Sequence, residues 1–358
     1  MEIIMLDVAN MKSLTPGTRA NRANGAIIDF LYNHPSLKLG GSAGFISERS
    51  DHQKIFGIHN IPNDRVYPIH EIEFTAIRGP HGTIPIRVLY PESGEDWRRR
   101  GEAAALIYFH GGGYTIGSVD EFENGLRLVA EGSGCQIYCV EYRLAPEYRY
   151  PVQLDEYDAV IDWLQGEQGK KRGIRGDRLA GGGDSAGGNL TASICLRRRD
   201  QGKKPLAAQV LVYPEARLPF DTLAAKENNT GYYLQANGIF GFADNYMPRP
   251  IRPNVGPTPL DPYISPGMQP ARDLGKQPKA LVVTNGFDPL RDVGIEYAGK
   301  LKEAGVHVNW IHFDDMTHGF LQMTPWSHGA GEAARTMAKA IGDLIYGKDL
   351  ENGGTGTT

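Results

Sequence analysis

The sequence predicts an α/β fold in which helices cover both faces of a mostly parallel sheet. Apolar runs of strand length, such as "AAALIYFH" at 103–110 and "KALVVTNG" at 279–286, are typical of strands buried on both faces. Segments with helical apolar spacing alternate with these runs through most of the chain, as in βαβ units. At 358 residues the chain can bury a large core, and α/β folds of this length often form one domain.

The expected elements follow in a regular order. Residues 17–68 carry helical spacing and then an irregular polar run, which indicates an arm outside the sheet. Alternating segments at 70–77 and 84–90 flank the turn "RGPHG" and predict an antiparallel hairpin. Further strands are expected at 103–110, 135–142, 178–183, 207–214, 279–286 and 306–313, and helices at 120–132, 150–165, 186–199, 289–305 and 328–347. The arginines of "LRRRD" at 196–200 are expected at a solvated helix end.

One internal stretch departs from this alternation. Residues 214–262 are rich in Pro, Asn and aromatic residues and show no strand pattern. We expect them to lie with the N-terminal arm over the carboxyl edge of the sheet, where ligands bind in such folds. The predicted division is an arm at 1–68, a core at 69–213 and 263–350, a helical cap insertion at 214–262, and a disordered tail at 351–358.

Net charge and cysteine content indicate which partners and which cellular compartment to expect. The net charge of −4 makes nucleic acid or an anionic membrane an unexpected partner. Three cysteines (Cys135, Cys139 and Cys195) do not form a disulfide framework, so we expect buried thiols in a reducing compartment. The first residues lack the basic and long apolar regions of a signal peptide. We therefore expect a cytoplasmic protein.

The stretch "GGGDSAGGNL" at 181–190 places one serine among five glycines. Residues 183–187 fit G-x-S-x-G, follow a short apolar run and precede a helical one, which is the setting of a nucleophile elbow. Side chains two residues before and after the serine would collide across so sharp a turn. The alternative is a glycine-rich loop with an idle serine. The strand–turn–helix context favours the elbow, with Ser185 projecting at the head of the following helix.

A serine nucleophile needs a base, and the base needs an acid to orient it. Four histidines follow Ser185. His318 in "DDMTHGF" lies just past a predicted strand, where it could reach the serine, whereas His307 and His312 fall within that strand. Asp288 follows another buried strand in "LVVTNGFDPLRD", so we prefer it to Asp292, which has already entered a helix. Asp288 could also serve as a helix N-cap, and both roles are compatible.

A second glycine-rich stretch, "FHGGGYTIG" at 109–117, follows the strand at 103–110. Glycines let backbone N–H groups approach a substrate closely, and such donors stabilise the oxyanion of acyl transfer. In the hydrolase pattern one donor lies in an HGGG motif and another on the residue after the nucleophile, here Ala186. A phosphate-binding loop is the competing interpretation. The stretch lacks both the lysine of a P-loop and the dinucleotide-binding spacing.

Taken together, "HGGGY", "YRLAPE", "GGDSAGGNL", "DPLRD" and "HGF" resemble the hormone-sensitive-lipase-like family of carboxylesterases within the α/β-hydrolases, over residues 70–345. The resemblance implies a catalytic triad of Ser185, Asp288 and His318. It implies oxyanion donors at Gly112, Gly113 and Ala186. It also implies that His110 supports the oxyanion loop, and that "GYYLQANGIFGFADNYM" at 231–247 is a cap helix whose aromatic residues line the ester pocket. The sequence departs from the family at Gly181 and Gly182, where apolar residues are usual.

The expected activity is hydrolysis of short- to medium-chain esters through an acyl-enzyme, without cofactor or metal. The residues expected to contact substrate are Tyr114, Tyr232, Tyr233, Phe240 and Phe242. The expected partner is a small-molecule ester, and a homodimer is left open. Another serine hydrolase activity (amidase, lactonase or deacetylase) stays open, as does a ligand receptor without catalysis. Receptors on this fold have lost the base, whereas Ser185, Asp288 and His318 are all present here.

Overall fold

We describe the protein from a computed structural model, which places residues 4–5, 19–41, 44–218, 220–248 and 256–347. The tail expected at 351–358 lies outside these residues. None of the helices in the described ranges is both long and apolar enough to cross a bilayer.

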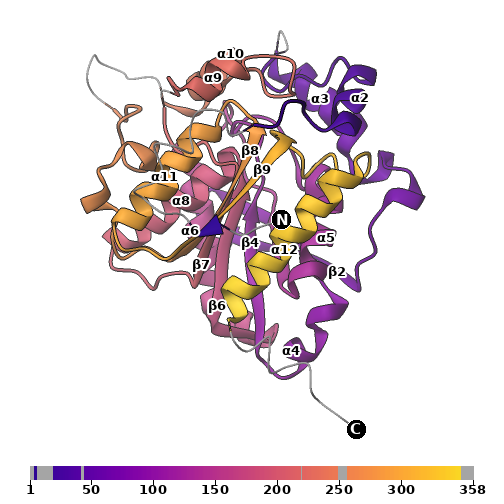
Figure 1. Cartoon of the computed structure of the whole chain (residues 1–358). Helices are drawn as coiled ribbons and strands as arrows, with labels where there is room; N and C mark the ends of the chain where they lie inside the picture. The colour runs from indigo at the N-terminus through magenta and orange to yellow at the C-terminus, as the bar shows by residue number, and fades with distance from the viewer. Residues whose placement is uncertain (1–3, 6–18, 42–43, 219, 249–255, 348–358) are drawn as a thin grey trace.

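One sheet runs through the molecule and confirms the predicted fold class (Figure 1). Its strand order is β1-β9-β8-β7-β6-β4-β5-β3-β2. The strands from β9 to β5 are parallel, and the hairpin β2–β3 joins β5 in antiparallel register. The bounds are β1 Ile4–Met5, β2 Glu71–Gly79, β3 Gly82–Tyr90, β4 Ala103–Phe109, β5 Gln136–Val140, β6 Ile174–Asp184, β7 Ala208–Val212, β8 Lys279–Phe287 and β9 Val308–Thr317. The two-residue strand β1, which pairs with β9, was not expected from the sequence.

Helices cover both faces of the sheet because its central strands are apolar on both sides. On β4, Leu106 packs in the cluster that contains α5 and α12, whereas Ile107 packs with α6 and α8 on the opposite face. The bounds of these helices are α5 Val119–Ser133, α6 Val152–Gln165, α8 Ala186–Asp200, α11 Arg291–Glu303 and α12 His328–Tyr346. Shorter elements are α4 Glu95–Arg99, α7 Glu167–Lys171, and the 3₁₀ turns Ile58–Asn60, Asn63–Arg65, Glu92–Gly94, Pro266–Met268 and Ala271–Asp273.

A helical layer lies over the carboxyl edge of the parallel strands, and two distant parts of the chain form it. The N-terminal part supplies α2 Gly25–Asn33 and α3 Phe45–Phe56, and the later part supplies α9 Leu223–Glu227 and α10 Ala236–Tyr246 (Figure 1). An isolated parallel bridge joins the parts between Leu39 and Leu234. Its hydrogen bonds run from Leu39 N to Tyr233 O (3.0 Å) and from Gln235 N to Leu39 O (2.9 Å).

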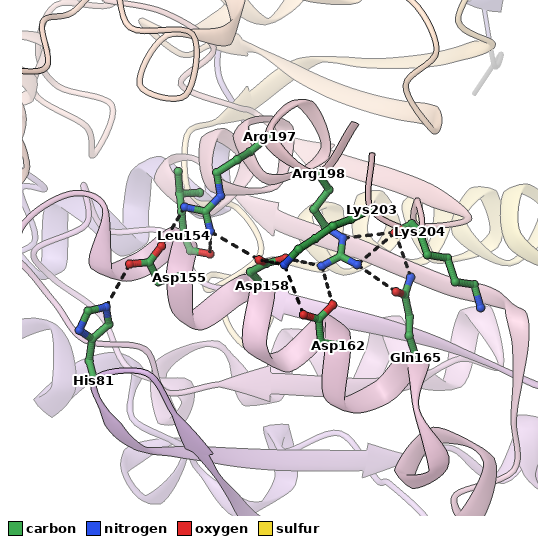
Figure 2. Close-up of polar contacts among 10 residues, drawn as sticks. All are labelled: His81, Leu154, Asp155, Asp158, Asp162, Gln165, Arg197, Arg198, Lys203 and Lys204. Atoms are coloured by element: carbon green, nitrogen blue, oxygen red, sulfur yellow. Dashed lines mark hydrogen bonds and ion pairs between the residues drawn. The ribbon is translucent and has the colours of Figure 1, made fainter. Parts of the chain in front are cut away.

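The arginines at 196–200 do not lie at the solvated helix end that was expected from the sequence. Arg198 is buried between α6 and α8, donating to Asp162 (2.7 Å) and Gln165 (3.0 Å) and pairing with Asp158 (Figure 2). Arg197 bonds to Asp155 (2.9 Å) from the same helix. The expectation of a solvated helix end was wrong, because acidic side chains on α6 face these guanidinium groups and allow their burial.

Candidate active site

Ser185 lies in a tight turn between β6 and α8. Its backbone is at φ 53° and ψ −118°, a conformation that residues with a Cβ rarely adopt. A Cβ on Gly187 would lie 1.8 Å from the carbonyl oxygen of Phe109, and one on Gly183 would lie 2.4 Å from that same oxygen. Glycine is therefore required on both sides of the serine, as the elbow interpretation predicts.

Three side chains from separate loops meet at this turn. His318 Nε2 is 2.9 Å from Ser185 Oγ, and His318 Nδ1 is 2.8 Å from Asp288 Oδ2. Because a carboxylate accepts hydrogen bonds, Nδ1 carries the proton and Nε2 presents its lone pair to the hydroxyl. The side chains are buried: Ser185 is 5% exposed, His318 1% and Asp288 0%. The structure thus brings together the three residues that the sequence selected.

The chain after β8 and β9 fixes the acid and the base. Asp288 directly follows β8, and its Oδ1 accepts a bond from Leu290 N (2.8 Å) just before α11. His318 directly follows β9, where Asn285 donates to Thr317 O (2.9 Å). The ring of Tyr213 lies 4.7 Å from the imidazole, centroid to centroid. Both catalytic candidates therefore sit on short, hydrogen-bonded strand ends.

The glycine-rich loop after β4 passes beside the serine. Gly112 has φ 107° and lines the same cavity as Ser185. Gly113 has φ 59°, and a Cβ there would lie 2.2 Å from the ring of Phe242. The N–H groups of Gly112 and Gly113 have no acceptor within the described ranges. Ala186 is the first residue of α8, so its N–H has no partner within the helix. No backbone hydrogen bond within the described ranges occupies these three donors, and Gly112 lines the cavity directly.

Asp184 holds this loop against the turn, a role that the sequence analysis missed. Its Oδ1 accepts from Gly111 N (2.8 Å) and from the Tyr108 hydroxyl (2.9 Å). Burial raises the pKa of Asp184 to about 6, while the bonds from Tyr108 and Gly111 oppose that rise. Because the residue before the serine varies freely in the G-x-S-x-G pattern, the motif gave no signal for this carboxyl group.

His110 lies beneath the glycine loop. Its Nδ1 donates to Gly111 O (2.8 Å), and Tyr142 donates from its hydroxyl to His110 O (2.8 Å). Burial lowers the pKa of His110 to about 4, so the ring is neutral near pH 7. A neutral ring with a protonated Nδ1 positions the loop without adding charge beside the serine.

A small cavity opens beside Ser185, and α3, the glycine loop, α5 and the cap line it. Of the five residues expected to contact substrate, Tyr233 lies on this cavity wall. Phe242 packs on Gly113, Tyr114 stacks on Tyr246 with ring centroids 3.8 Å apart, and Tyr232 packs near Phe287. Phe240 is 58% exposed on α10 and does not reach the cavity. The sequence analysis missed Leu39, His52 and Glu121, which also line it.

Comparisons with known proteins agree with this geometry. The α/β-hydrolase fold family matches residues 106–322. The esterase LipI of Mycobacterium tuberculosis is 32% identical over 290 residues, covering 81% of this chain and 87% of its own. The ethyl acetate hydrolase of Pseudomonas putida is 33% identical over 262 residues, covering 72% and 78%. The structure of a hyperthermophilic esterase from the archaeon Pyrobaculum calidifontis matches with a TM-score of 0.79 and 30% identity, covering 90% of this chain and 99% of its own.

The fold, with a Ser–His–Asp arrangement at the carboxyl edge of its sheet, defines an α/β-hydrolase. The chain belongs to the hormone-sensitive-lipase-like family of carboxylesterases, as the motifs at 110–114, 142–147 and 182–190 imply. It is a carboxylic ester hydrolase.

Proposed function

We propose that Ser185 is the nucleophile that forms an acyl-enzyme with the ester substrate. His318 Nε2, 2.9 Å from Ser185 Oγ, takes the hydroxyl proton as that oxygen attacks the carbonyl carbon. Asp288 holds Nδ1 in the protonated tautomer and stabilises the imidazolium that forms. His318 then gives the proton to the departing alcohol. In the second half, His318 activates a water that hydrolyses the acyl-enzyme.

The oxyanion of each tetrahedral intermediate is assigned to the N–H groups of Gly112, Gly113 and Ala186. Their lack of other acceptors supports this assignment, because a donor that is already bonded would have to break that bond first. The head of α8 also favours negative charge at this point. Each such donor typically contributes about 3–4 kcal/mol to stabilising the transition state.

The single observation that carries the proposal is the continuous line from Asp288 through His318 to Ser185, with 2.8 Å and 2.9 Å contacts. Two buried contacts of this kind, at a strained turn, give a hydroxyl the base that it needs. We further propose short- to medium-chain esters as substrates, because the cap and the arm enclose the cavity above the serine. We expect hydrolysis in the cytoplasm without metal or cofactor.

A panel of p-nitrophenyl esters from acetate to palmitate tests this function. We expect kcat/KM to peak at acyl chains of about two to six carbons, since each further methylene gains about 0.8 kcal/mol only where there is room to bury it. Ser185→Ala should lower kcat on the best ester by at least 10⁴-fold, because loss of such a nucleophile typically costs about 10⁶-fold. A p-nitroanilide of the same acid serves as the amide comparison. Retention of more than a hundredth of the activity in Ser185→Ala would exclude this nucleophile.

A further inference from the structure

Three polar side chains on the cavity wall beside Ser185 have no role in the proposed mechanism. His52 comes from α3, Glu121 from α5, and Gln322 from the segment after β9. All three line the cavity that contains Ser185 and His318. Separate elements thus direct hydrogen-bonding groups to one space, next to apolar lining from Leu39 and Phe122.

His52 lines this space and carries an unpaired hydrogen-bond acceptor. The side chain is 1% exposed, and its Nδ1 is 2.8 Å from the carbonyl oxygen of Glu48. A carbonyl only accepts, so Nδ1 carries the proton and Nε2 carries the lone pair. Burial lowers the pKa of His52, which keeps the ring neutral. Within the described ranges, Nε2 has no hydrogen-bond partner.

Glu121 adds a buried carboxyl oxygen that also lacks a hydrogen-bond partner. Its side chain is 4% exposed, and Oε1 lies 3.1 Å from the Ser118 hydroxyl. Oε2 has no hydrogen-bond partner among the residues that the structure describes. Burial raises the pKa of Glu121 to about 8, and the nearby charges of Glu141 and Asp120 act in the same direction. Near pH 7 this carboxyl group is therefore largely protonated without a ligand, and an ammonium group or a hydroxyl that donates to Oε2 would favour the carboxylate.

Tyr233 lies beside His52 on the same wall and bonds to Gln322, the third polar side chain. Its ring lies 5.7 Å from that of His52, and its hydroxyl donates to Gln322 Oε1 (3.3 Å). Buried polar groups in folded proteins are mostly paired. His110 Nε2 is also unpaired, but this residue lies outside the lining of the cavity. Two unpaired polar atoms on one cavity wall, both from buried side chains, indicate a ligand that supplies the missing donors.

We propose that this wall binds a hydrogen-bond donor on the ester substrate, a hydroxyl or an ammonium group, through His52 Nε2 and Glu121 Oε2. The inference rests on the proposed esterase function and specifies its substrate class. Esters of purely hydrocarbon acids and alcohols leave both acceptors unsatisfied and bind less well. A site built to bond a substrate hydroxyl or amine discriminates strongly against an analogue that lacks it.

Isosteric esters test the proposal in the wild-type protein. Methyl 3-methylbutyrate, the enantiomers of methyl 3-hydroxybutyrate and those of methyl 3-aminobutyrate differ only by CH₃, OH or NH₃⁺ on the acyl chain. Propyl butyrate and 2-hydroxyethyl butyrate make the same exchange on the alcohol. We expect kcat/KM for at least one donor-bearing ester to exceed that of its hydrocarbon isostere by tenfold or more. If no donor-bearing ester exceeds its isostere, the proposal is overturned.

Two variants test whether His52 and Glu121 cause the preference for donor-bearing esters. Glu121→Gln and His52→Phe should each lower the ratio of donor-bearing to hydrocarbon kcat/KM by at least threefold, with Glu121→Gln affecting the ammonium ester most. Glu95→Gln is the matched control, because this buried carboxylate lies on α4, outside the lining of the cavity, and pairs with Arg98 and Arg99. Its ratio should equal that of the wild type. An unchanged ratio in both cavity variants would overturn the proposal, and either variant suffices if the other does not fold.

Failure of the esterase function and failure of the polar subsite give different results with these esters. Loss of all turnover on every ester in the set, p-nitrophenyl acetate included, would contradict the esterase function itself. Turnover of the hydrocarbon esters without any donor preference would leave the esterase function in place and overturn the polar subsite alone.

Discussion

At the scale of single residues, Ser185 occupies a backbone conformation that costs about 1–3 kcal/mol, and its neighbours hold it there. Ser185 N donates to Val212 O (2.9 Å), and Glu215 N donates to Ser185 O (3.2 Å). Asp184, one residue earlier, ties the glycine loop to the same turn through Gly111. The proposed nucleophile and the glycine loop that carries the proposed oxyanion donors are thus fixed relative to each other by Asp184 and Ser185.

Asp184→Ala tests this link between the turn and the loop. The change removes the acceptor of Gly111 N and of the Tyr108 hydroxyl, so the loop loses its anchor while the triad stays complete. We expect kcat to fall by about 10–100-fold with little change in KM, since the oxyanion is bound only in the transition state. The measurement is steady-state kinetics on p-nitrophenyl butyrate.

Asp184→Asn is the matched control, because its amide oxygen can still accept from Gly111. It should recover most of the rate that Asp184→Ala loses. Equal losses of kcat in the two variants would show that positioning through Oδ1 is not the role of this residue.

At the scale of elements, the start of α8 packs directly against the end of β4, where Gly187 leaves no room for a Cβ beside Phe109. The space beside the β6 glycines is also filled: a Cβ on Gly181 would lie 2.8 Å from the Tyr157 hydroxyl, and one on Gly182 would lie 2.9 Å from Leu106. Gly181 and Gly182, at positions where the family usually has apolar residues, still pair with β4 on one side and β7 on the other. A tyrosine from α6 occupies part of the volume that a strand side chain would otherwise take.

Gly187→Ala should destabilise the protein severely. Its added Cβ would lie 1.8 Å from Phe109 O, so α8 must move away from β4. We expect a loss of at least about 3 kcal/mol in the free energy of unfolding, at the upper end of the overpacking range. Urea unfolding followed by tryptophan fluorescence measures it.

Gly241→Ala provides the comparison within a helix. Gly241 lies inside α10 with nothing within 4 Å of an added Cβ, so alanine should stabilise by about 0.5–1 kcal/mol. Similar stability changes in the two variants would contradict the steric account of the turn.

The elements were predicted well where a repeated pattern specifies them. Buried strands and amphipathic helices can be predicted from the spacing of their apolar residues. His318 and Asp288 were found because they directly follow such strands. The burial of Arg198 was not predicted, because it depends on acidic partners on α6 that only the tertiary fold places beside it. His52 was missed for a similar reason: its helix meets the cavity only through the tertiary fold.

At the scale of the whole molecule, buried carboxyl groups make stability depend on pH, and two of them, Asp184 and Glu215, lie next to the turn at Ser185. Burial raises the pKa of Glu215 to about 8, opposed by a bond from Tyr114, and raises that of Asp184 to about 6. Because each folded-state pKa lies above that of the unfolded chain, the folded protein binds more protons between the two values. These groups therefore reduce stability as pH rises through that window.

Glu215→Gln should flatten the dependence of stability on pH. Glu215 has a pKa of about 8 when folded and about 4.5 when unfolded. Between pH 5 and 8 it should therefore lower the free energy of unfolding by up to about 1.4 kcal/mol for each pH unit. The glutamine variant lacks this contribution, so its unfolding free energy should fall less over the same range. Urea unfolding at pH 5, 6, 7 and 8 measures the difference.

Glu95→Gln is the control here as well. Bonds from Arg98 and Arg99 lower the pKa of Glu95, so this carboxylate is ionised in both states throughout the window. Its removal should leave the slope from pH 5 to 8 unchanged. A Glu215→Gln slope equal to that of the wild type would contradict the buried-carboxyl account.

The backbone bridge between Leu39 and Leu234 has a consequence for the order of folding. The segments that it joins are separated in sequence by every strand from β2 to β7, so closing that loop costs chain entropy that few local contacts return. The parallel strands and their crossover helices can assemble without it. The arm should therefore dock late, completing the substrate cavity after the strand ends that carry the triad are in place. The folding chain would then assemble the proposed triad before the arm closes the cavity wall beside it.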